Sequence, residues 1–558
     1  MTRGVHGLPA SGTGAVRTAG IAATVLALCG LVAAPVFALA AGAWGGGRTT
    51  VVRTLDDPGL HRAVWHTVVI AMVVTVIAVA TGTALALAFE RATLPASPLW
   101  RLALVVPVVV PQFVLTLSWT QAYGPGGLSE RLTGVTLPGL YGPLGIAVLL
   151  VVEAVPLAWL VVGAGLAVRR EPDLNRAARA SGAGAWRTFA TVDLPLLRGP
   201  LLAATSLVSV GVVNSFAVPQ VLGSGAGFQT LATLVYQQLS LSAGRDAFGA
   251  LSVVSLVMVL LVLAASAGVD RGLRGSPRQR RAGAAGARPT HVRTPASLAS
   301  SSVVAAYILF ATAVPLAALL LTSLTRAPGL APIPANWTVQ GYRAGVTGQA
   351  GAALGRSVLL SLSAAVVVTL LAGAVVGLGG EARRRLGTAV TLGFALPGSA
   401  LAVGLLIAYG RFLDGSVLII LVAYVAKFWA VGHRALAAGA DRLAPEWHRA
   451  GRVSGASPLT VLRTVTTPLM ATGVATSAGL VALFALHELT LSSILYGPLS
   501  TTYAVIVLDQ QQLGDVAGGA SSALILTLPP ALVLAVGALL IRRRDRRLRT
   551  GASGRADD

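Results

Sequence analysis

Two ionisable side chains, His487 and Glu488, are adjacent in an apolar stretch of sequence that is long enough to cross a bilayer. Glu488 is the outstanding acid inside such a stretch, where a charged group is costly unless it faces a cavity or a partner. Carboxylate and imidazole groups can meet a cation or hydrogen-bond a polar solute, although one His and one Glu are too few to predict a metal site. The alternative is a structural bond from Glu488 to Lys427, the only lysine in the sequence.

One polar stretch of the sequence occurs twice. Residues 176–195 read RAARASGAGAWRTFATVDLP, and residues 449–468 read RAGRVSGASPLTVLRTVTTP. Identities fall at one constant offset, which indicates an internal repeat: Arg176, Ala177, Gly182, Ala183, Val192 and Pro195 match Arg449, Ala450, Gly455, Ala456, Val465 and Pro468. At this offset Asn214 and Ser215 are the counterparts of His487 and Glu488. These four residues are therefore predicted to line a polar route between the two repeats.

Each repeated stretch has the residues of two short helices separated by a glycine. Gly182 and Gly455 can adopt the left-handed conformation that ends a helix, and the alanines before Gly182 favour helix. A second helix is predicted from Trp186 to Leu194 and Pro195. The small residues in both copies favour close docking into matching grooves of a paired partner. The alternative is an ordinary loop that packs beneath its own helices.

The composition is that of a membrane protein built from helices. Of 558 residues, 55% are hydrophobic and 11% are charged, and the mean hydropathy is +0.77; soluble chains carry about 25% charged residues. Because the apolar runs are continuous and do not alternate, we expect an all-α polytopic fold and not a barrel. Twelve transmembrane helices are predicted at about residues 18–43, 65–89, 101–123, 144–168, 199–223, 247–269, 298–323, 357–380, 387–410, 416–437, 471–496 and 519–541.

Arginine placement predicts the orientation in the membrane. The N-terminus and every second connection are basic, whereas the connection 497–518 has no Arg or Lys. By the positive-inside rule both termini face the cytoplasm, in a multi-pass protein of the plasma membrane. Most of the formal charge of +22 then reflects topology, and no nucleic-acid partner is expected. A cleaved signal ending near Ala40 is the alternative for the first helix, but its length and the alternation of charge favour an uncleaved helix.

Residues 271–297 divide the chain in two. They are rich in Arg, Gly, Ala and Pro and could not form a core, so they are predicted to be a basic cytoplasmic linker. Six predicted helices precede the linker in a first half, 1–270, and six follow it in a second half, 298–558. Because six is even, both halves enter and leave on the same side, and the repeat is parallel and not inverted.

The repeated stretch resembles the signature loop of the membrane-spanning subunits of ABC importers that work with a substrate-binding protein. That signature is Glu-Ala-Ala, three residues, Gly, nine residues, an aliphatic residue, any residue and Leu-Pro. Here Arg replaces the leading Glu in both copies, and Thr467 replaces Leu in the second. In that family the loop is a coupling helix that docks on an ATP-binding subunit. The resemblance implies a coupling role for Arg176, Ala177, Ala178, Gly182, Leu194, Pro195, Arg449, Ala450, Gly451, Gly455 and Pro468.

Other segments are similar to fused, twelve-helix permeases for iron(III). They are NSFAVPQVLG (214–223), TLATLVYQQLS (230–240), ALPGSALAVGL (395–405), FALHELTLSSILYGP (484–498) and TTYAVIVLDQQQLGD (501–515). Iron-type permeases commonly have an acid at both repeat positions, whereas here Ser215 is the counterpart of Glu488. The resemblance implies import of a solute that an extracytoplasmic binding protein delivers, with iron(III) as the expected cargo. Permeases for thiamine, polyamines and phosphonates share much of the pattern, and these solutes are the alternatives.

The sequence lacks the motifs of an enzyme. No Gly-x-x-x-x-Gly-Lys-Ser/Thr phosphate loop is present, so ATP and Mg²⁺ are expected on two copies of a separate ATP-binding subunit, and no cofactor is expected on this chain. Cys29 is the only cysteine, which excludes a disulfide within the chain. The runner-up function is an ion-coupled secondary transporter that uses Glu488 and His487.

Overall fold

The computed structural model describes residues 11–91, 97–168, 177–178, 180–241, 245–274, 295–327, 329–378, 380–441, 460, 463–464, 467–529 and 531–532. Within these residues the regular structure is helical, apart from one isolated antiparallel bridge between Thr325 and Trp337. The predicted all-α fold is confirmed. A helix satisfies its backbone hydrogen bonds within one segment, which is what a continuously apolar chain requires in a bilayer.

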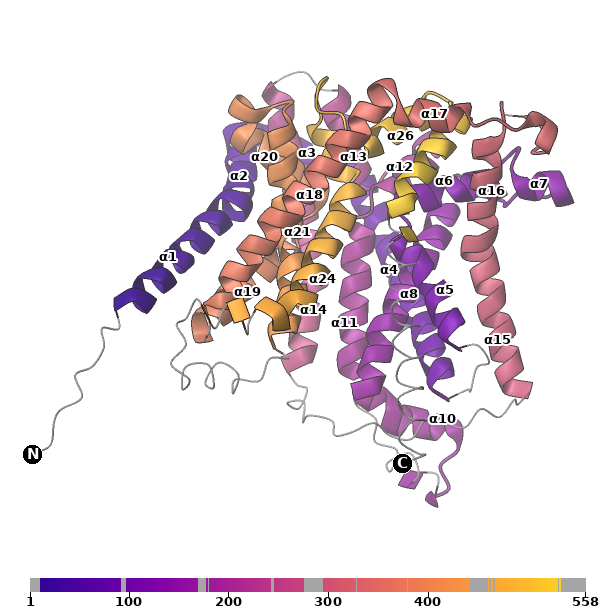
Figure 1. The fold of residues 1–558 in the computed structure, drawn as a ribbon, viewed down its shortest axis with the longest axis horizontal. Coiled ribbons are helices and arrows are strands. Elements are labelled where there is room, and N and C mark those ends of the chain that lie inside the picture. The colour runs from indigo at the N-terminus through magenta and orange to yellow at the C-terminus, as the bar shows by residue number, and fades with distance from the viewer. Residues whose placement is uncertain are drawn as a thin grey trace, which may run out of the picture. The chain divides into compact units, whose positions relative to one another are not determined.

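The helices follow one another along the chain as Figure 1 labels them. Before residue 275 they are α1 (Ser11–Leu28), α2 (Ala34–Gly45), α3 (Gly47–Leu55), α4 (Pro58–Arg91), α5 (Ser97–Val109), α6 (Gln112–Tyr123), α7 (Leu128–Thr133), α8 (Pro143–Val168), α10 (Ala185–Thr188), α11 (Leu194–Val213), α12 (Ala217–Gly223), α13 (Leu231–Leu241) and α14 (Arg245–Arg274). After it they are α15 (Pro295–Ile308), α16 (Val314–Leu324), α17 (Gln340–Val346), α18 (Gly348–Gly377), α19 (Gly380–Gly393), α20 (Gly398–Leu413), α21 (Val417–Ala440), α24 (Thr467–Leu486), α25 (Thr490–Leu495) and α26 (Tyr503–Gln512).

Each of the twelve predicted transmembrane ranges overlaps an apolar helix or helix pair. Among the described residues, 9 helices are long and apolar enough to cross a membrane, and the count is 11 if two bent pairs are each one span. The shorter helix Val516–Pro529 lies where the twelfth span was predicted, 519–541, and the residues from 533 onward are outside the described part. The polytopic fold class is therefore confirmed.

The third predicted helix of each half is two helices joined by a bend. α5 meets α6 at 104°, and α19 meets α20 at 99°. The second helix of each pair begins directly after a proline, Pro111 or Pro397, whose ψ angle is 134° or 139°. Proline has no N–H to donate and pushes the preceding residue out of the helical region, so it ends one helix and starts the next.

Helix packing divides the chain into two compact units that each draw on both halves of the sequence. Unit 1 contains Met1–His61, Leu234–Val262 and Ala352–Val505. Unit 2 contains Arg62–Thr233, Leu263–Gly351 and Ile506–Asp558. The predicted halves, 1–270 and 298–558, describe the order of the repeats along the chain. In packing, the first helices of each half belong with later helices of the other half.

In unit 1, α2 packs against α20. A Cβ atom on Gly404 of α20 would lie 2.7 Å from the carbonyl oxygen of Pro35, so glycine is what lets the two backbones approach. The Tyr409 hydroxyl donates to the carbonyl oxygen of Gly30 at 2.7 Å. Gly30 belongs to a π-helical turn, Cys29–Ala33, that joins α1 to α2.

In unit 2, α16 packs against α6 in the same manner. The Tyr123 hydroxyl donates to the carbonyl oxygen of Phe310 at 2.7 Å, and Trp119 Nε1 donates to that of Ala311 at 3.1 Å. Both acceptors lie in a second π-turn, Leu309–Ala313. Tyr123 and Tyr409 each lie eleven residues after the first residue of their helix. The internal repeat is therefore preserved in hydrogen bonds as well as in sequence.

A proline explains each of these π-turns. Pro35 and Pro315 are the second residues of the helices that follow the two turns, and Pro195 stands in the same relation to a third turn, Phe189–Asp193. Proline clashes with the carbonyl four residues earlier and cannot donate to it. A π-turn widens the helix at that point, and carbonyl groups are left to accept hydrogen bonds from side chains of other helices.

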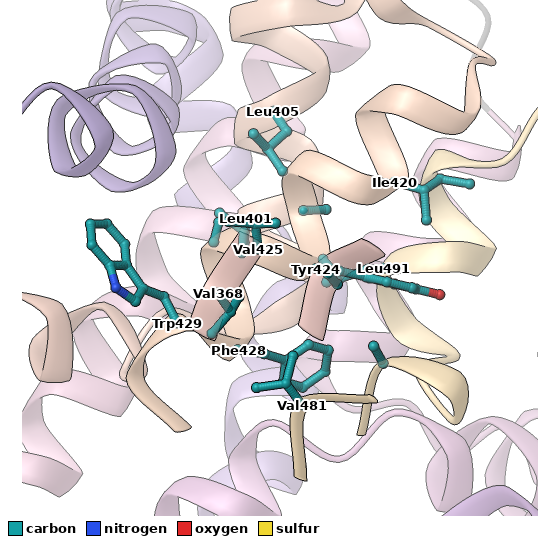
Figure 2. Close-up of a cluster of buried hydrophobic side chains, with 14 of the residues drawn as sticks. Val368, Leu401, Leu405, Ile420, Tyr424, Val425, Phe428, Trp429, Val481 and Leu491 are labelled. Atoms are coloured by element: carbon teal, nitrogen blue, oxygen red, sulfur yellow. The ribbon is translucent and has the colours of Figure 1, made fainter. Parts of the chain in front are cut away.

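The core of unit 1 is an apolar cluster around α21, which Figure 2 shows. Tyr424 and Trp429 of α21 are fully buried, and Val368, Leu401 and Val481 reach them from α18, α20 and α24. In a bilayer the attraction between helices comes from such close contact, because the surrounding lipid is as apolar as the side chains.

Glycine allows a close crossing of the fourth and fifth spans in both repeats. In unit 1, a Cβ atom on Gly439 of α21 would lie 3.0 Å from Cα of Gly473 in α24. In unit 2, a Cβ atom on Gly165 of α8 would overlap the ring of Pro200 in α11. The fourth and fifth spans of each half therefore cross at equivalent points, which fixes the position of the fifth span.

Candidate functional site

The fifth span of each half is broken at the predicted pathway residues. α11 ends at Val213 and α12 begins at Ala217, whereas α24 ends at Leu486 and α25 begins at Thr490. Asn214 and Ser215 lie in the first break, and His487 and Glu488 lie in the second. The ranges 199–223 and 471–496 were each predicted as one transmembrane helix, and the breaks were not predicted because hydropathy is continuous across both. Non-helical backbone at membrane depth is tolerated where protein or a cavity surrounds it.

In unit 1 the second break carries a buried ion pair. Lys427 Nζ of α21 donates to Glu488 Oε2 at 2.9 Å. The other carboxylate oxygen, Oε1, accepts a hydrogen bond at 3.0 Å from the backbone N–H of Leu491, in the first turn of α25. The Lys427 side chain is 22% exposed and that of Glu488 9%. Both carboxylate oxygens of Glu488 are thus occupied, as the structural alternative predicted.

The surroundings of this pair are closely packed. A Cβ atom on Gly398, the first residue of α20, would lie 2.8 Å from Lys427 Nζ. The Tyr424 hydroxyl lies 2.6 Å from Ser492 Oγ, and Ser492 donates to the carbonyl oxygen of Glu488 at 2.7 Å. Glycine at 398 leaves the ammonium group room beside the bend, and the hydroxyls satisfy the backbone opened by the break.

In unit 2 the first break carries a neutral hydrogen-bond chain that ends on a carboxylate. Ser215 Oγ donates to Gln112 Oε1 at 3.1 Å, and Gln112 Nε2 donates to Glu153 Oε2 at 2.6 Å. Glu153 Oε1 and Asn214 Oδ1 are buried and have no hydrogen-bond partner among the described residues. Gln112 and Glu153 were not predicted as site residues. Glu153 could have been found as a second acid within a predicted helix, 144–168, whereas nothing in the sequence pairs it with Gln112.

The two polar centres occupy equivalent positions in the repeat. Glu153 and Lys427 each lie ten residues after the first residue of their helix, Pro143 or Val417. Each approaches the first residue of the helix after the bend, Gln112 or Gly398, and each is linked to the break in the fifth span. The two copies of the repeat therefore share this geometry but differ in charge: Glu153 takes the place of Lys427, and Ser215 takes the place of Glu488.

These centres do not form a metal-chelating cluster. Across the part of the chain that the structure describes, no three His, Cys, Asp or Glu side chains are grouped so that they could hold a metal ion. The polar centres can contact a solute through single groups.

The first repeated loop has the predicted helical turn and glycine stop. Ala177 and Ala178 are helical, and their carbonyl oxygens accept from the N–H groups of Ser181 and Ala183, both at 3.0 Å. Gly182 has a φ of +79°, in the left-handed region. No atom lies within 4 Å of where a Cβ on Gly182 would stand, so backbone conformation and not space requires glycine. Arg176 lies outside the described residues.

The second helix of the loop continues into the membrane and does not stop at Leu194 and Pro195. Residues Trp186–Val213 form one 28-residue helix, which includes the π-turn Phe189–Asp193. The predicted separation of this helix from the fifth span at 199 is therefore wrong. Pro195 stands in the first turn after the π-turn, where the widened helix accommodates it. Leu194 and Pro195 are exposed on this continuous helix, which runs from the loop to the break at Asn214.

Little of the second repeated loop is described. Arg449, Ala450, Gly451 and Gly455 lie outside the described residues. Arg463 and Thr464 are π-helical, like the equivalent stretch of the first loop, and Pro468 is exposed at the start of α24. The described residues of the two loops therefore share the widened helix and the proline after it.

The comparison with protein families decides what this arrangement is. The model of the binding-protein-dependent transport system inner membrane component matches residues 79–275 and again residues 365–550. The chain belongs to this family. It is a fused ABC permease, because the two matches lie in one polypeptide and each covers one copy of the repeat. Members of the family work with ATP-binding and solute-binding partners, and the chain is accordingly a multi-pass membrane protein of an ABC importer.

Relatives of the permease extend over most of its length. An Fe(3+)-transport system permease protein, FbpB 2, of Haemophilus influenzae is 23% identical over 86% of this chain and 90% of its own length. A probable ABC transporter permease protein, y4fN, of Sinorhizobium fredii is 27% identical over 87% of this chain and 88% of its own. The trehalose transport system permease protein SugA of Mycobacterium tuberculosis is 29% identical over 38% of this chain and 73% of its own. The names include both ferric iron and a sugar, so they assign the family and not the cargo.

Proposed function

We propose that this permease imports iron(III), delivered by an extracytoplasmic binding protein and driven by two copies of an ATP-binding subunit. The iron assignment is supported by a ferric permease that matches both halves of the chain, whereas the trehalose permease SugA matches 38% of it. Thiamine, polyamines and phosphonates are the alternative solutes for the same architecture. An ion-coupled secondary transporter is the alternative mechanism.

The proposed coupling role is supported by the position of the first repeated loop directly before a long helix. A partner that binds Ala177, Ala178 and Gly182 would hold the loop that directly precedes the 28-residue helix Trp186–Val213, which ends next to the break at Asn214. A rigid helix transmits displacement along its axis, so movement of the loop moves the polar break. This continuity is the observation that supports ATP-driven opening and closing of a pathway lined by Asn214, Ser215, His487 and Glu488.

ATP and Mg²⁺ would then be bound by the partner subunits, and this chain would carry no cofactor of its own. Two repeated loops imply two docking positions, with Arg176 and Arg449 in the places where the family signature has Glu. Both loops and both termini would face the cytoplasm, since the arginine-rich connections all lie on one side by the positive-inside rule. The binding protein would release its solute to the opposite, outer face.

Co-purification with the ATP-binding subunit tests the coupling role. Gly182→Leu together with Gly455→Leu should abolish co-purification, because Leu at a φ of +79° is strained and projects from the docking surface. Gly134→Leu is the matched control: its φ is +72°, its surroundings are equally open, and it lies at the end of α7, far along the chain from both loops. Retention of the subunit by the double variant would remove the coupling role.

A further inference from the structure

The two polar centres differ in how their acids are balanced. In unit 1 the charge of Glu488 is neutralised by Lys427, and its second oxygen caps α25. In unit 2 the equivalent positions hold Glu153 and Ser215, and no described cation pairs with Glu153. Glu153 Oε2 accepts a hydrogen bond from the amide of Gln112. The repeat thus contains one balanced acid and one that lacks a counter-charge among the described residues.

The surroundings of Glu153 favour the binding of a cation. Glu153 Oε1 is buried and has no hydrogen-bond partner among the described residues. Leaving such an oxygen unsatisfied in an apolar setting is unfavourable, and either a proton or a bound cation relieves it. Asn214 Oδ1, next along the chain to Ser215, is a second buried oxygen without a described partner. The unsatisfied atoms of this centre are therefore acceptors, which is what a hard cation requires of its ligands.

We propose that Glu153 is the residue at which a hard metal cation contacts the permease during its passage. Gln112 and Ser215 act as positioning residues: Ser215 holds the Gln112 amide, and Gln112 holds one carboxylate oxygen so that Oε1 is presented to the cation. Glu488, whose two oxygens are occupied, serves the structure of the break. The inference rests on the proposed iron function and names the side chain that recognises the cargo's charge.

One carboxylate suits transport better than a full ligand set would. A site that lets an ion pass must bind it strongly enough to admit it and weakly enough to release it. Three or more grouped His, Cys, Asp or Glu side chains, which would bind iron tightly, are not found among the described residues. A single anionic oxygen beside neutral amides meets both requirements.

Cation binding to the purified full-length chain tests the site directly. The chain is placed in nanodiscs of phosphatidylcholine and titrated with Tb³⁺, a hard trivalent probe, followed by its luminescence. Glu153→Gln should weaken the saturable binding at least tenfold, and Glu153→Asp should retain most of it because the carboxylate remains. Glu381→Gln, which removes a 48% exposed carboxylate on α19, is the matched control and should bind as the wild type does. Binding by Glu153→Gln equal to that of the wild type overturns the inference.

Iron uptake separates this inference from the function on which it rests. In proteoliposomes with the ATP-binding subunit and binding protein, Glu153→Gln should lower Fe(III) uptake at least fivefold, and Glu381→Gln should leave it unchanged. Equal uptake by wild type and Glu153→Gln overturns the inference and leaves the iron function standing. Failure of the wild type itself to import Fe(III), with Tb³⁺ binding still dependent on Glu153, overturns the iron function and leaves the cation contact standing.

Discussion

Replacing Lys427 by Met should destabilise unit 1 strongly, because it leaves the Glu488 carboxylate buried without its counter-charge. Met has nearly the length of Lys and no charge, so the change removes the ion pair and keeps most of the packing. The Lys427 ammonium lies 2.9 Å from Glu488 Oε2, and the two side chains are 22% and 9% exposed. The variant therefore isolates the electrostatic contribution of the pair to the stability of the fold.

The magnitude follows from the distance and the burial. Two unit charges 2.9 Å apart attract by about 6 kcal/mol at an effective dielectric constant of about 20. Desolvation of both groups offsets much of that attraction, so the intact pair contributes little net stability. Removing one partner keeps the desolvation of the other and loses the attraction, which costs about 3–5 kcal/mol. Lys427→Met should lower the free energy of unfolding by that amount.

A double-mutant cycle measures this effect. The free energy of unfolding is determined by denaturant titration of the purified chain in bicelles, for Lys427→Met, Glu488→Gln and the double variant. The double variant should be more stable than Lys427→Met, because no charge is left unpaired. Arg383→Met is the control in the same unit: its pair with Asp441 is as close, at 2.7 Å, but Asp441 is 68% exposed. An exposed pair is worth about 0–1 kcal/mol, so this control should change little.

Two results would refute the reasoning. If Lys427→Met loses no more stability than Arg383→Met, the pair at the break is not electrostatically important. If the stability that the double variant loses relative to the wild type equals the sum of the two single losses, Lys427 and Glu488 act independently and do not compensate each other.

Three further variants test the account. Trp186→Ala should weaken co-purification with the ATP-binding subunit at an unchanged melting temperature, because Trp186 is 78% exposed on the loop helix; full retention would exclude it as an anchor. Gly439→Leu should lower the melting temperature, because a Cβ atom at that position already meets Gly473. Gly377→Leu, in open surroundings, should leave the melting temperature unchanged. Equal effects of the two variants would contradict a close crossing of α21 and α24 at Gly439. Burial raises the pKa of the Asp509 carboxyl above its ordinary value of 3.8. Ionisation of Asp509 therefore lowers the free energy of unfolding as the pH rises from the ordinary pKa through the raised one. Asp509→Asn should be more stable than wild type at pH 7 and equal below pH ~3; a constant difference across pH would contradict this cause.

The sequence predicts the parts of the fold that hydropathy and residue chemistry control. Continuous apolar runs predict the positions of the helices. A glycine directly after an alanine-rich helical stretch predicts a left-handed residue that ends the helix, which is what Gly182 is. The repeat of 176–195 at 449–468 predicts paired loops, and the family comparison matches both halves. What these features share is that each depends on neighbours in the sequence.

The parts that were missed depend on contacts between distant residues. Hydropathy is continuous across Asn214 and Glu488, and the breaks there are held by bonds to Gln112 and Lys427 from other helices. The same holds for the exchange of first helices between the halves, which Tyr123 and Tyr409 secure through carbonyls of π-turns. Pairing of residues that far apart is set by packing and not by local pattern.

ATP-driven import by this permease is tested most directly by solute uptake into reconstituted proteoliposomes. Vesicles containing this chain and its ATP-binding subunit, with the binding protein on the outer side, are supplied with iron(III). The account predicts uptake that requires internal ATP and all three components, and that persists when ionophores abolish every ion gradient. Uptake by the chain alone, driven by an ion gradient and indifferent to ATP, would contradict it.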